Sequence, residues 1–267
     1  FTKPFNSTLL QARIGALLER KRLRDSEDEL RHQVQEYNLQ LEVLVEQQVR
    51  LIAAGHISTI FAMSKLAESR DQQTGLHLER MREYCRILAQ YLQSLPKYSD
   101  RINNQYIEAL YAASPLHDIG KVAIPDSILL KPGKHTPEER KVMESHAVIG
   151  AETLRQVYDS HRNNDLVSLG IQIAESHHEH WDGTGYPFGR SGEDIPLSAR
   201  ILALADVYDA LRAERVYKPS FSHTESRVII LNGSGTHFDP AVVEAFVATE
   251  AEFISVKKQW DELSLTS

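Results

Sequence analysis

A long stretch without helix-breaking residues limits what the first part of this chain can form. No Gly or Pro occurs between Gly15 and Gly55, and both residues strongly disfavour the interior of a helix. Within this stretch, seam positions alternate spacings of four and three over about four heptad repeats. They are Leu23, Glu27, Leu30, Val34, Tyr37, Leu41, Leu44, Gln48 and Leu51. The pattern predicts a coiled-coil helix that pairs in parallel with a second copy, and the alternative is an amphipathic helix packed on its own domain.

After Gly55 the chain shows helical patterns separated by turn clusters, with no strand-like alternation long enough to build a sheet. We therefore predict an all-α fold. The expected helices are Thr74-Leu95, Asn104-Leu116, Pro137-Tyr158, Asp165-Glu179, Pro196-Ala213, His223-Asn232 and Pro240-Phe253. The glycine-rich stretch Trp181-Ile195 is too long for a simple connection, so we expect a functional loop there.

Charge and composition exclude several classes of protein. Thirty Lys and Arg against 37 Asp and Glu give a net charge of −7, which argues against binding duplex nucleic acid but leaves room for a small anion in a local basic pocket. No run approaches the roughly eighteen apolar residues of a membrane span. The single Cys85 excludes an intrachain disulfide, and we expect a cytoplasmic protein. The chain opens at Phe1 without a signal-peptide pattern, so we expect a piece of a longer protein.

Imidazole and carboxylate groups are the strongest chemical feature of the chain. Twelve His beside one Cys suit iron, manganese, nickel or zinc better than calcium or magnesium. His117 and Asp118 follow an apolar helical pattern, with Lys121 one turn further on. Adjacent helical residues project about 100° apart, so this pair can bind different faces of one metal centre, and a carboxylate can bridge two cations.

Further imidazoles and carboxylates lie on successive predicted helices, at His77, His146, His177-His178 and Asp206. His146 and Asp206 have apolar neighbours, and a buried polar or charged group there must be paired or coordinated. On separate helices of one bundle, these residues resemble the inward-pointing ligands of dinuclear helical-bundle metal sites.

A series of motifs in a fixed order identifies the family that the chain resembles. The motifs are Arg70-Asp71, Thr74-Gly75-Leu76-His77 and Arg80; Leu116-His117-Asp118-Ile119-Gly120-Lys121; His146; His177-His178-Glu179-His180-Trp181-Asp182-Gly183-Thr184-Gly185-Tyr186-Pro187; Asp206-Val207-Tyr208-Asp209-Ala210; Arg215-Val216-Tyr217-Lys218; and Gly235-Thr236-His237-Phe238-Asp239-Pro240. From about Ala67 to Phe253 the chain resembles the HD-GYP family of metal-dependent phosphodiesterases. The resemblance implies an HD-type helical bundle with a dinuclear metal site, here preceded by the long coiled-coil helix.

The resemblance also implies the roles of individual residues. The implied metal ligands are His77, His117, Asp118, His146, His177, His178 and Asp206. They would hold two divalent transition-metal ions, Fe, Mn, Ni or Zn, with Asp118 bridging. Lys121 is the expected partner of a phosphate oxygen or of the leaving group, and catalysis is assigned to Lys121 and Asp118.

Gln73 departs from the family pattern. Members with a third metal carry Glu four residues before the first His ligand, and Gln73 occupies that position here. Because a neutral amide is a poorer cation ligand than a carboxylate, we predict two metals rather than three.

Four residues are implied as substrate contacts. Arg215 and Lys218 match the phosphate-binding pair of the family, and Tyr186 lies in the Gly-Tyr-Pro loop. Asp209, one turn beyond Asp206, either orients a ligand or meets the substrate. Glu179 is expected to support an imidazole. No role is expected for His180 or for the histidines in polar or loop contexts, His32, His56, His135, His161 and His223.

The chain start carries a weaker resemblance, because Lys3-Pro4 before a helical stripe is similar to the end of a response-regulator receiver domain. We expect a receiver remnant over 1–22, a coiled-coil linker over 23–60 and a phosphodiesterase domain over 61–267. The expected function is hydrolysis of cyclic di-GMP to pGpG, and on to GMP, as the output domain of a two-component regulator. The alternatives are preference for linear pGpG or another cyclic dinucleotide, or a non-catalytic nucleotide-sensing or protein-docking module whose Gly-Tyr-Pro loop meets other signalling proteins.

Overall fold

The structure is a computed structural model that describes residues 7–70, 76–158, 165–213 and 220–264, without the side chains of residues 50, 53, 54 and 56. The chain divides into two compact units, Phe1–Ile57 and Ser58–Ser267. Several predictions concern residues outside the described part of the chain, namely Lys3-Pro4, Gln73, His161, Arg215, Lys218 and the side chain of His56.

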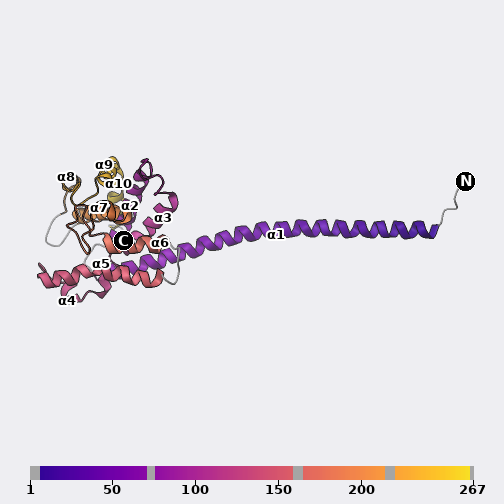
Figure 1. The fold of residues 1–267 in the computed structure, drawn as a ribbon, viewed down its shortest axis with the longest axis horizontal. Helices are drawn as coiled ribbons and strands as arrows, with labels where there is room; N and C mark the ends of the chain where they lie inside the picture. Colours follow the sequence, from indigo (N-terminus) through magenta and orange to yellow (C-terminus); the bar gives the residue numbers. More distant parts are fainter. Residues whose placement is uncertain (1–6, 71–75, 159–164, 214–219, 265–267) are drawn as a thin grey trace. The chain divides into compact units, whose positions relative to one another are not determined.

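Unit 1 is helical from Ser7 onward, and its helix α1 (Ser7–Glu68) continues without a break into the first residues of unit 2 (Figure 1). The helix covers the whole of the predicted heptad region. In this single chain the apolar seam positions are exposed, for example Leu30 at 62% and Leu44 at 53%. Such a seam is typical of a helix that packs on another chain.

Unit 2 is built from short helices, and the described residues contain no strand beyond one isolated bridge, between Ser234 and Phe238. The helices after α1 are α2 (His77–Gln93), α3 (Asn104–Ala113), α4 (Asp126–Leu129), α5 (Pro137–Tyr158), α6 (Asp165–Ser176), α7 (Leu197–Arg212), α8 (His223–Asn232), α9 (Pro240–Ala248) and α10 (Glu250–Ser264). Three 3-10 turns are η1 (Ser114–Leu116), η2 (Ile119–Ala123) and η3 (Gly192–Asp194). The predicted all-α class is confirmed.

The core of unit 2 forms around α2, which packs against α3, α7, α9 and α10. Apolar side chains recur along α2 at helical spacing, so that Met81, Tyr84 and Leu88 are fully buried. The ring of Tyr84 stacks on Phe253 of α10 with centroids 4.5 Å apart and meets Tyr208 of α7 edge-on. This core holds α2 and α7 side by side, which matters for the site because both helices carry predicted ligands.

The helix ends follow local capping chemistry. At the start of α9, Asp239 accepts a hydrogen bond from the Ala241 amide, and Pro240 occupies the first helical position. Ser222 and Glu225 form a capping box at the start of α8. Both α5 and α8 have the bounds expected from the sequence.

Other predicted bounds were wrong. The helix expected over Asn104-Leu116 ends at Ala113 and tightens into η1, because Pro115 disfavours α-helical geometry in the residue before it. His117 and Asp118 therefore lie in a turn between two 3-10 segments rather than at an α-helix end. The single helix expected over Pro240-Phe253 is two, α9 and α10, which separate at Thr249.

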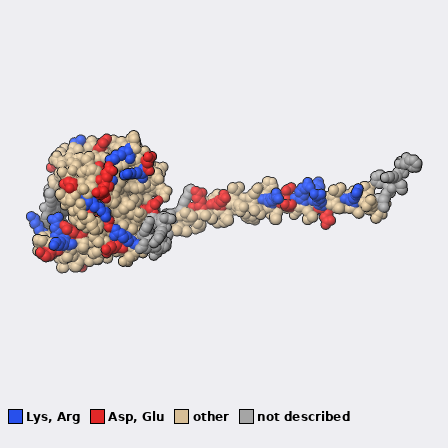
Figure 2. Space-filling view, in the orientation of Figure 1, with Lys and Arg blue, Asp and Glu red and all other residues tan. Residues whose placement is uncertain are grey.

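On the face of unit 2 that Figure 2 shows, acidic and basic side chains are interspersed rather than gathered by sign. Among the described residues, no helix combines the length and the apolar character that crossing a membrane requires.

Candidate metal centre

The seven predicted ligands come from five separate segments of unit 2. His77 is the first residue of α2, His117 and Asp118 lie between η1 and η2, and His146 is in α5. The remaining three are His177 and His178, just after α6, and Asp206 in α7. The structure brings them into two groups in which the ligand atoms lie within 4.8 Å of one another. The groups are Asp118, His146, His177 and His178, and separately His77, His117 and Asp206.

The carboxylate of Asp118 lies between the two groups. Its Oδ1 is 3.3 Å from His146 Nε2 and 3.8 Å from His177 Nε2, whereas its Oδ2 is 3.3 Å from His117 Nε2. Two atoms that bind one cation at about 2.1 Å lie roughly 3.0–3.4 Å apart at tetrahedral or octahedral angles. The separations of 3.3 Å to His146 and to His117 lie in this range, so the two oxygens suit cations in different groups, whereas the 3.8 Å to His177 is longer.

The imidazoles are oriented as ligands. In three of them, Nδ1 donates to a backbone carbonyl three or four residues earlier: His117 to Ser114, His146 to Met143, and His177 to Ile173 and Ala174. The opposite atom, Nε2, is buried in each and makes no hydrogen bond within the described structure. A neutral imidazole that donates through one nitrogen offers a lone pair on the other. Buried lone pairs without partners fit a bound cation.

The electrostatics of the first group suit positive charge. Burial opposes ionisation of Asp118, but Lys121 and His117 outweigh it and hold the pKa of Asp118 well below its usual range. Burial, together with the neighbouring imidazole of His178, holds the pKa of His177 well below its usual range. Burial also lowers the pKa of His178 to about 3. Two neutral imidazoles therefore face a carboxylate anion, which is the protonation state that metal binding requires.

His77 is held by a buried ion pair. Asp209 is 1% exposed, and its carboxylate accepts from His77 Nδ1 at 2.7 Å and from the Arg80 guanidinium at 2.6 and 2.8 Å. Burial opposes ionisation of Asp209, but these bonds lower its pKa to about 2. With both oxygens engaged behind His77, the geometry favours the ligand-orienting alternative for Asp209 and leaves no exposed oxygen for a substrate.

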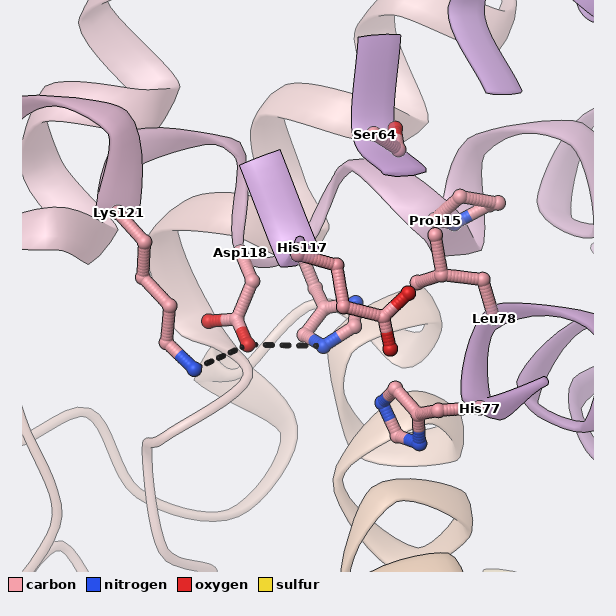
Figure 3. Close-up of a pocket in the computed structure, with 8 residues that line it drawn as sticks. Ser64, His77, Leu78, Pro115, His117, Asp118 and Lys121 are labelled. Atoms are coloured by element: carbon pink, nitrogen blue, oxygen red, sulfur yellow. Dashed lines mark ion pairs between the residues drawn. The ribbon is translucent and has the colours of Figure 1, made fainter. Parts of the chain in front are cut away.

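Lys121 lines a pocket that also borders His77, His117 and Asp118. Its Nζ is 2.7 Å from Asp118 Oδ2. Figure 3 shows this ion pair and the contact between the same carboxylate and His117. The 3-10 turn η2 places it there by packing closely on α5: a Cβ on Gly120 would lie 2.0 Å from the carbonyl oxygen of His146. Only glycine allows this approach.

The Gly-Tyr-Pro loop is fixed against the second imidazole of the His177-His178 doublet. The ring of Tyr186 stacks on His178 with centroids 4.6 Å apart. Glu179, expected to support an imidazole, instead accepts hydrogen bonds from the backbone amides of Phe188 and Arg190. Its carboxylate holds the loop that carries Tyr186.

Some residues near the centre carried no predicted role. Arg80 is the buried partner of Asp209, and Arg70, just after α1, donates to the carbonyls of Lys121, Val122 and Ile124. Both arginines belong to the first motif. The partners of Arg70 lie about fifty positions away and that of Arg80 lies 129 positions away, so sequence spacing could not predict these contacts. Glu68, at the end of α1, also lines the pocket.

The remaining histidines that the structure describes make other contacts. His223 contacts Tyr208 and Glu250, and His135 contacts the Ile128 carbonyl. The rings of His180 and His237 pack against each other, 4.1 Å apart. None of these belongs to either ligand group.

Comparison with known proteins gives one family and several curated relatives. The family described as HD domain matches residues 61–242. A cyclic di-GMP phosphodiesterase of Vibrio cholerae is 54% identical over 197 residues, 74% of this chain and 40% of the relative. A 3'3'-cGAMP-specific phosphodiesterase 2 of the same organism is 41% identical over 198 residues, 74% of this chain and 35% of the relative. The cyclic di-GMP phosphodiesterase response regulator RpfG of Xanthomonas campestris is 35% identical over 262 residues, 98% of this chain and 64% of the relative.

The chain spans less than two thirds of the length of each of these relatives. The matched family implies binding of divalent metal ions, and the structure holds two groups of residues suited to them.

Proposed function

Because this chain belongs to the HD domain family, we propose that it is a metal-dependent phosphodiesterase of the HD-GYP type that hydrolyses cyclic di-GMP to pGpG and then to GMP. The observation that carries the proposal is the position of Asp118, whose two oxygens face different groups of imidazoles. Its relatives support the substrate class, since they are named for cyclic dinucleotides.

The proposed ligands divide into two sets that share Asp118. One cation is assigned to His146, His177 and His178, and the other to His77, His117 and Asp206. We propose two divalent transition-metal ions, from Fe, Mn, Ni or Zn, which suit imidazole-rich sites. When bound, such a pair activates water and neutralises charge on the phosphoryl group.

The residues of the chain prepare that chemistry. Hydrolysis adds water to phosphorus and breaks the bond to one ribose oxygen. Opening the ring leaves a phosphate at one end of pGpG and a ribose hydroxyl at the other, and hydrolysis of the second diester then releases two GMP. The Lys121 ammonium, now paired with Asp118 at 2.7 Å, can move to a phosphate oxygen or stabilise the departing ribose oxygen. Tyr186 offers a ring at the edge of the site, while Arg215 and Lys218 are proposed for the second phosphate of a cyclic dinucleotide.

Assembly forms a second part of the proposal. The exposed heptad seam of α1 supports a parallel homodimer, and the RpfG likeness across 98% of the chain supports an output role in a response regulator. We keep the proposed domains at 1–22, 23–60 and 61–267, with the last forming the phosphodiesterase. A cytoplasmic location follows from this role.

A product time course tests the function. The 267-residue chain, loaded anaerobically with Mn²⁺ or Fe²⁺, is given cyclic di-GMP, 3'3'-cGAMP and pGpG in parallel reactions that are resolved by chromatography. We expect the fastest loss for cyclic di-GMP, and Asp118→Ala should slow it about a thousandfold or more, since several kcal/mol of stabilisation are removed.

The 41% identity to a 3'3'-cGAMP-specific enzyme makes that dinucleotide the second candidate. Faster loss of 3'3'-cGAMP would identify it as the preferred substrate. No loss of any of the three by metal-loaded protein would refute the enzyme proposal and favour a docking module, in which Asp118→Ala leaves signalling intact.

A further inference from the structure

A carboxylate outside the proposed ligand set faces the second group of ligands. Glu68, the last residue of α1, lines a pocket together with His77, His117, Asp118 and Lys121. Figure 3 shows the labelled side chains of these four residues directed toward the same space. Residues of α1 therefore form one wall of the proposed metal site.

Three buried lone-pair atoms in this pocket lack a hydrogen bond within the described residues. They are Glu68 Oε1, His77 Nε2 and His117 Nε2. A buried carboxylate oxygen without a partner is costly, and such an atom in a native site points to a bound ion or water. Burial raises the pKa of Glu68, and the charges of His77 and His117 act in the opposite direction, which agrees with their closeness.

The position of Glu68 is fixed by contacts on both sides of it. Lys65, one turn earlier in α1, forms an ion pair with Glu79 of α2 at 2.5 Å. Arg70, two residues later, donates to the carbonyls of the η2 segment and to Asp126 at 2.6 Å. These contacts hold the end of α1 against both α2 and the segment after Asp118, so the carboxylate is not at a loose helix end.

We propose that Glu68 is a further ligand of the cation held by His77, His117 and Asp206. The inference rests on the proposed metal site. It adds a second terminal carboxylate to a group that otherwise contains two imidazoles and Asp206, beside one oxygen of Asp118. A cation with more anionic ligands binds more tightly, so this cation depends on α1 for part of its affinity.

The test measures metal binding rather than activity. Mn²⁺ binding to the full chain is titrated by the electron paramagnetic resonance signal of the free ion, which resolves two dissociation constants if two sites are present. Glu68→Gln keeps the size of the side chain and removes its charge. We expect it to weaken one site at least about tenfold, as loss of a supporting residue already does, and to leave the other within about twofold.

The matched control is Glu83→Gln. Glu83 is a half-buried α2 carboxylate whose oxygens are engaged by Arg86 and Tyr111, and it does not line the pocket. Both sites should keep their wild-type affinity in this variant. Glu68→Asp, which retains the charge, should fall between the wild type and Glu68→Gln, and circular dichroism verifies that each variant is folded.

Two backgrounds assign the effect to one site. In His146→Ala, which removes a ligand of the first group, Glu68→Gln should still weaken the remaining site. In Asp206→Ala, which already lacks a ligand of the second group, Glu68→Gln should cause little further loss of Mn²⁺ affinity. Two unchanged Mn²⁺ affinities in folded Glu68→Gln would overturn the inference and leave the proposed function standing. A wild-type chain that binds no Mn²⁺ would overturn both.

Discussion

Replacing Asp209 by Asn should weaken both the fold and one metal site. The variant keeps the shape of the side chain but leaves the buried Arg80 guanidinium without a counter-charge and His77 Nδ1 without its anionic acceptor. Burial opposes ionisation, but the bonds to Arg80 and His77 lower the pKa of Asp209 from 3.8 to about 2, a stabilisation of roughly 2–3 kcal/mol at neutral pH. Breaking a buried ion pair costs about 3–5 kcal/mol, so we expect a loss of about 3 kcal/mol.

Urea unfolding of the metal-free protein measures the first effect. With a slope of about 3 kcal/mol/M, a loss of about 3 kcal/mol lowers the midpoint by roughly 1 M. Competition titration with a chelator measures the second, and removal of the carboxylate behind a ligand imidazole should cost about 10- to 100-fold in affinity at one site. Asp100→Asn, which alters an exposed carboxylate, should change neither quantity.

The reasoning would be refuted by one particular combination of results. If Asp209→Asn unfolded at the wild-type midpoint, kept both metal affinities and only raised the KM for the dinucleotide, Asp209 would be a substrate contact. The buried geometry described above predicts the opposite: a lower unfolding midpoint and a weaker metal affinity, without a change confined to KM.

Three further perturbations test other parts of the structure. Gly120→Ala places a Cβ 2.0 Å from a backbone oxygen of α5, so it should lower the free energy of unfolding in urea by about 2–4 kcal/mol. The control Gly15→Ala, with nothing within 4 Å, should be neutral or stabilising. Equal unfolding midpoints for the two variants would contradict the steric argument. Tyr186→Ala removes a stacked ring worth about 0.5–1.5 kcal/mol and should lower kcat/KM by up to about tenfold, whereas Tyr186→Phe should retain most of it; equal losses would mean that the hydroxyl matters instead. Replacing Leu30 and Leu41 on the seam by Ser should convert a dimer to a monomer in analytical ultracentrifugation, and an unchanged mass would place the dimer contact elsewhere.

Local patterns predicted much of the secondary structure. The bounds of α5 and α8 could be predicted because Pro137 opens the first and the Ser222 capping box opens the second. The end of α3 was predicted too late, although Pro115 carried the information, because apolar periodicity continues past it. The division at Thr249 could not be anticipated, since the apolar pattern continues across α9 and α10.

The site was predictable only where a motif carries it. His117 and Asp118 stand next to each other in the sequence, and the structure places them at one centre with the other predicted ligands. The support around them depends on partners distant in the chain. Arg80 pairs with Asp209 across 129 positions, and Glu179 holds loop amides rather than a ring. Tertiary packing decides such contacts, and no spacing rule encodes them.

The local anchoring of the imidazoles has a consequence for the order in which the two halves of the centre become competent. His117, His146 and His177 are each oriented by a carbonyl of their own segment, so these rings are set as soon as the surrounding backbone forms. His77 instead takes its orientation from Asp209 on α7, and its group includes Asp206 of the same helix. The first half can therefore mature with the packing of α5 on α6, whereas the second must await the docking of α2 on α7. During refolding, uptake of a cation by the two halves should be sequential.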